Sequence, residues 1–68
     1  MNEDYLNMEI RKFLKNVGIT SQRIIENLIY EADKNGTIKA GDEIKLKMTL
    51  SIMDYQSIDI IDGKIMIE

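Results

Sequence analysis

The sequence predicts an α+β fold in which two N-terminal helices pack on a small antiparallel sheet. Apolar residues recur with helical spacing through the first half of the chain, and from Ile44 onward they alternate with polar residues. Glycines stand between the segments, where turns are expected. The 68 residues leave room for one α+β domain, residues 1–68.

The first predicted helix spans Asp4 to Asn16. Asn2 or Asp4 can cap its start, and Gly18 stands where a left-handed residue closes a helix. Its apolar stripe consists of Leu6, Ile10, Phe13, Leu14 and Val17. This spacing places all five side chains on one side of a helix.

The second predicted helix spans Ser21 to Asn35. Thr20 or Ser21 is the candidate cap at its start, and Gly36 is the candidate left-handed residue after its end. Its apolar face consists of Ile24, Ile25, Leu28, Ile29 and Ala32. Residues 17–21 would then form a corner between two packed helices.

The second half of the chain predicts a loop over 36–43, which Ile38 anchors, followed by strands. Residues 44–52 alternate apolar and polar, as a half-buried strand does. The Asp62-Gly63 pair predicts a two-residue hairpin turn, which would place Ile58, Ile60, Ile65 and Ile67 on one face. The resulting order is ααβββ. If 58–61 is not a regular strand, the order is ααββ and residues 55–59 form a connection.

The composition argues against catalysis and against general nucleic-acid binding. The chain has no Cys and no His, which removes disulfides, thiol nucleophiles, imidazole bases and the common zinc ligand sets. Asp54, Asp59 and Asp62 are close in sequence, but their spacing matches no calcium loop, so we interpret them as solvated acids. We therefore predict a non-enzymatic protein without cofactor or metal.

The net charge of −3 is opposite to that of a phosphate-binding surface. The opening residues do not form a signal peptide, and no segment is apolar enough to span a membrane. A small soluble cytoplasmic protein is the expectation.

A cluster of basic residues near the predicted corner is the candidate anion or nucleic-acid contact. It consists of Arg11, Lys12, Lys15 and Arg23. The corner also resembles a helix–turn–helix, but Glu26, Glu31 and Asp33 would face phosphate repulsively, and no residues remain for a third helix. Nucleic acid is therefore the less favoured partner, and the corner itself is interpreted as structural.

Several apolar residues lie outside the predicted core faces and form the candidate association surface. They are Met8, Tyr30, Tyr55, Ile61 and Met66. Scattered over the surface they would be ordinary exposed residues. Gathered together they would mark a protein–protein interface, and a chain this short has reason to form a homodimer. Association with an unknown protein partner or with itself is therefore the favoured function.

Three motifs resemble a small bacterial family of uncharacterised proteins, a domain of unknown function. They are N-M-x-I-R-K-F-L-K-x-V-G-x-T-S-Q over 7–22, M-T-L-x-I over 48–52 and I-D-G-x-I over 61–65. This chain departs from the family pattern at Ile25 and in the loop after Gly36. The resemblance covers nearly the whole chain, implies one compact domain, and implies no activity, cofactor or site residue.

Overall fold

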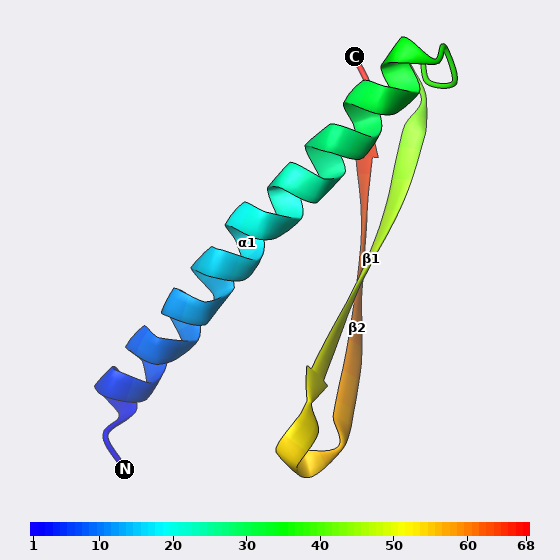
Figure 1. Ribbon diagram of the computed structural model, residues 1–68. Coiled ribbons are helices and arrows are strands. Elements are labelled where there is room, and N and C mark those ends of the chain that lie inside the picture. The colour runs from blue at the N-terminus through cyan, green and yellow to red at the C-terminus, as the bar shows by residue number, and fades with distance from the viewer. The chain divides into compact units, whose positions relative to one another are not determined.

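The computed structural model describes residues 1–68 and has one long helix and one β-hairpin (Figure 1). The elements are α1 (Glu3–Lys34), β1 (Glu43–Ile52), the short 3-10 helix η1 (Met53–Tyr55) and β2 (Ser57–Met66). The predicted α+β class is confirmed. The chain divides into two compact units, a helix unit of residues 1–37 and a hairpin unit of residues 38–68.

The predicted pair of helices is wrong, because α1 runs without interruption through residues 17–21. Gly18 lies inside the helix and does not adopt a positive φ. A glycine inside a helix costs only about 1 kcal/mol relative to alanine, and no proline is present to interrupt the backbone hydrogen bonds. The interhelix corner therefore does not exist, and neither does a helix–turn–helix.

Both ends of α1 follow the sequence signals. Asn2 caps the start, where its Oδ1 accepts a hydrogen bond from the Tyr5 backbone N–H at 3.1 Å. At the other end Gly36 has a φ of +72°. The Gly36 N–H donates to the Asp33 carbonyl at 3.1 Å and the Thr37 N–H to the Ala32 carbonyl at 3.0 Å. This is a Schellman motif, so the prediction of Gly36 as the closing residue is confirmed.

The hairpin unit pairs β1 with β2 in antiparallel register over ten residue pairs, from Glu43 opposite Met66 to Ile52 opposite Ser57. The turn is η1 followed by Gln56, which has a φ of 52°. The predicted Asp62-Gly63 turn is wrong, since both residues lie inside β2. That turn would have paired only four residues on each side, whereas pairing β2 with β1 joins ten residues of each strand.

The register decides which side chains share a face of the hairpin, because directly paired residues point to the same side. The apolar face carries Ile44, Leu46, Met48, Leu50, Ile52, Ile61 and Ile65. The mixed face carries Glu43, Lys45, Lys47, Thr49 and Ser51 opposite Met66, Lys64, Asp62, Ile60 and Ile58. The prediction that Ile58 and Ile60 share a face with Ile65 and Ile67 is therefore wrong. The predicted alternation of 44–52 is confirmed, and the third strand is absent.

The loop between the units contains the one buried residue of the chain. Ile38, which is 9% exposed, was predicted to anchor this loop. The loop closes where the Lys39 N–H donates to Asp42 Oδ2 at 3.0 Å and the Gly41 N–H to the Ile67 carbonyl at 2.7 Å. No side chain anywhere in the chain is fully buried. Each unit taken by itself thus has secondary structure but almost no core.

Candidate association surfaces

The two predicted helical stripes merge into one, because α1 is continuous. Each residue turns a helix by about 100°, so residues 18 apart return to the same direction, as Ile10 and Leu28 do. The merged set, here called the helix stripe, contains Leu6, Ile10, Phe13, Leu14, Val17, Ile24, Ile25, Leu28, Ile29 and Ala32. Three polar residues lie inside it: Ser21, Asn7, which shares its direction with Ile25, and Glu31, which shares its direction with Phe13. The stripe runs along a helix of 32 residues, which is about 48 Å long.

The helix stripe is largely accessible to solvent. Leu28 is 72% exposed and Ile24 63%, and Leu6, Ile10, Phe13 and Leu14 are also exposed. Val17, Ile25, Ile29 and Ala32 are half-buried. A long apolar stripe on a helix ordinarily faces a core or another helix. This is the largest candidate interaction surface of the helix unit.

The hairpin unit carries a second apolar surface, on the apolar face defined by the register. Its seven apolar side chains are half-buried or exposed, with Ile61 among the most exposed. Gly63 lies on the same face, opposite Leu46, in ordinary extended backbone. A two-stranded hairpin is marginally stable by itself, so a covering layer on this face would stabilise it.

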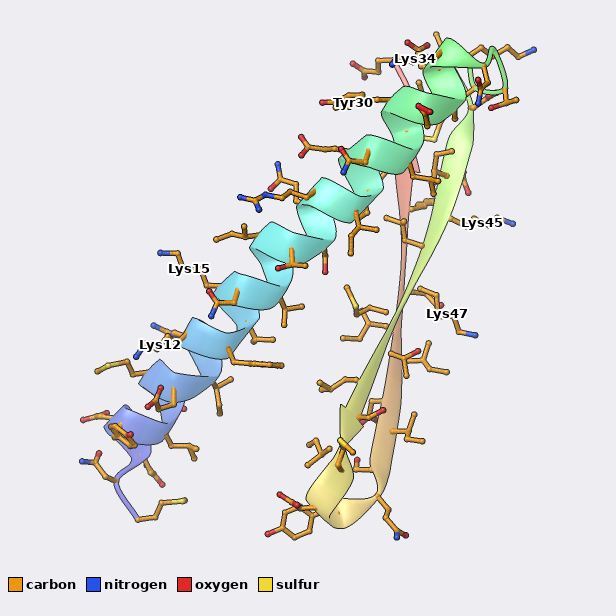
Figure 2. All side chains as sticks on the ribbon, viewed as in Figure 1. Lys12, Lys15, Tyr30, Lys34, Lys45 and Lys47 are labelled. Atoms are coloured by element: carbon orange, nitrogen blue, oxygen red, sulfur yellow. The ribbon has the colours of Figure 1, made fainter.

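The predicted basic cluster does not converge on a corner. Lys12, Lys15 and Arg23 project from the side of α1 opposite the helix stripe, and Arg11 lies at the edge of the stripe. Figure 2 shows Lys12 and Lys15 on the same side of α1 as Tyr30. From Arg11 to Arg23 the four residues extend over about 18 Å of helix. They form a charged solvent side along the helix.

The residues predicted as an association surface do not form one patch within either unit. Met8 and Tyr30 share a side of α1, but they are separated by about 33 Å of helix. Tyr55 lies in η1, and Ile61 and Met66 lie on opposite faces of the hairpin. All five are exposed. Only Ile61 belongs to one of the two apolar surfaces described above.

The sequence analysis missed the continuous helix stripe because it interpreted Gly18 as the end of a helix. The signal was present in the spacing, since Val17, Ile24 and Leu28 continue the direction set by Ile10 and Leu14. The two halves of the stripe are therefore in phase, which two helices joined by a turn would not require.

The carboxylates of the hairpin unit do not assemble into a site. Asp54 lies in η1, while Asp59 pairs with Leu50 on the apolar face and Asp62 with Lys47 on the mixed face. The sequence placed Asp62 in a turn, which is wrong because the register differs, but all three acids are exposed, as the interpretation of solvated acids requires. The structure contains no group of three potential metal-ligating side chains.

The fold and the surfaces define a small α+β chain with one long amphipathic helix and one two-stranded hairpin, each with an apolar face. No helix in it is both long enough and apolar enough to cross a membrane. The chain belongs to the family of unknown function DUF6494, whose model matches residues 1–68. The resemblance to a domain of unknown function is thereby confirmed. No curated protein and no solved structure matches the chain.

Proposed function

We propose that this chain is a non-enzymatic protein that works by self-association, with apolar surfaces of two copies covering one another. The observation that carries the proposal is the apolar face that each unit presents by itself: ten apolar residues line one side of α1, and seven apolar side chains share one face of the hairpin. Burial of apolar side chains is the main favourable term in folding. Pairing with a second copy buries these faces.

The side-chain chemistry supports a role without catalysis. The chain has no His or Cys, and the acids of its hairpin unit lie on different faces or in the turn. General acid–base and nucleophilic catalysis both need reactive groups held together at hydrogen-bonding distance. The family to which the chain belongs has no known activity that would indicate otherwise.

Sedimentation velocity over a range of low to high micromolar concentrations tests the proposal. We expect a species of twice the 7.9 kDa chain mass and an unfolding midpoint that rises with concentration. A 7.9 kDa species at high micromolar concentration that unfolds cooperatively and independently of concentration would overturn the proposal. In that case one copy must bury its own helix stripe.

A further inference from the structure

We draw no further inference here: the strongest candidate, the helix stripe along α1, is an unpartnered apolar face, and nothing in the structure shows what covers it.

Discussion

The helix unit and the hairpin unit form their backbone hydrogen bonds in different ways, and each unit presents an apolar face. In α1 every interior hydrogen bond joins residues four apart, so the helix needs only local sequence. The hairpin needs ten cross-strand pairs in one register, which residues 43–66 must find together. A helix can therefore absorb one unfavourable residue such as Gly18, whereas a one-residue shift of the hairpin would move every side chain to the other face.

The two units also segregate their side chains differently. The helix stripe lies on one side of α1, with Lys12, Lys15 and Arg23 on the other. The hairpin carries seven apolar side chains on one face, but Ile58, Ile60 and Met66 on the mixed face as well. The helix unit thus has the larger and more continuous apolar surface, and under the proposed self-association its variants should have the larger effect.

The largest effect is expected for a charge placed in the helix stripe. Ile24→Glu should weaken dimerisation by about 100-fold or more, because it loses a buried side chain and buries a charge in its place. Met8→Glu is the matched control: Met8 and Ile24 are both 63% exposed, but Met8 lies on the opposite side of α1. Sedimentation at equal concentrations compares the two. If Met8→Glu dissociates the dimer and Ile24→Glu does not, the helix stripe is not the interface.

Next in size is the contrast between two glycines of the hairpin unit. Gly41 has a φ of +95°, which strains any other residue, so Gly41→Ala should cost about 1–3 kcal/mol of unfolding free energy. Gly63 lies in extended backbone with open space around its Cβ position, so Gly63→Ala should gain about 0.5–1 kcal/mol. Urea unfolding measures both. A loss of stability in Gly63→Ala would favour the Asp62-Gly63 turn that the structure lacks.

A similar contrast separates two asparagines of the helix unit. Asn2→Ala removes the side-chain oxygen that accepts the Tyr5 N–H, and it should cost about 1 kcal/mol. Asn16→Ala, in the helix interior, should instead gain a few tenths of a kcal/mol because alanine is the better helix former. Thermal unfolding followed by circular dichroism compares them. A helix that ended at Asn16 would show no such gain.

The smallest effect is expected for the basic side of α1. With a net charge of −3 and basic residues spread along the helix, the chain should elute from heparin at low salt. The double variant Arg11→Ala/Lys15→Ala should elute at the same salt concentration as the unaltered chain. Salt-sensitive retention that the double variant loses would instead establish the basic residues as an anion or nucleic-acid contact.

Local sequence signals predicted secondary structure correctly where no longer-range interaction opposed them. They failed where a longer helix or strand pairing ran through them. Gly36 was assigned correctly as the residue that closes a helix, and Asn2 was one of two candidate caps for its start, since caps depend on neighbouring backbone groups. Gly18 and the Asp62-Gly63 pair were misread. Each is a common turn signal, but here each lies within a longer element. The candidate interface was missed for the same reason, because its two halves join only when α1 is continuous.

The sequence by itself determined the α+β class, the ends of the helical region and the alternation that makes β1 a strand. These follow from side-chain periodicity and capping, which act over a few residues. Only the tertiary structure decided that β2 pairs with β1 over its whole length and that Ile58 and Ile65 lie on opposite faces. Strand register depends on residues far apart in the chain, and ten paired residues outweigh a local two-residue turn signal.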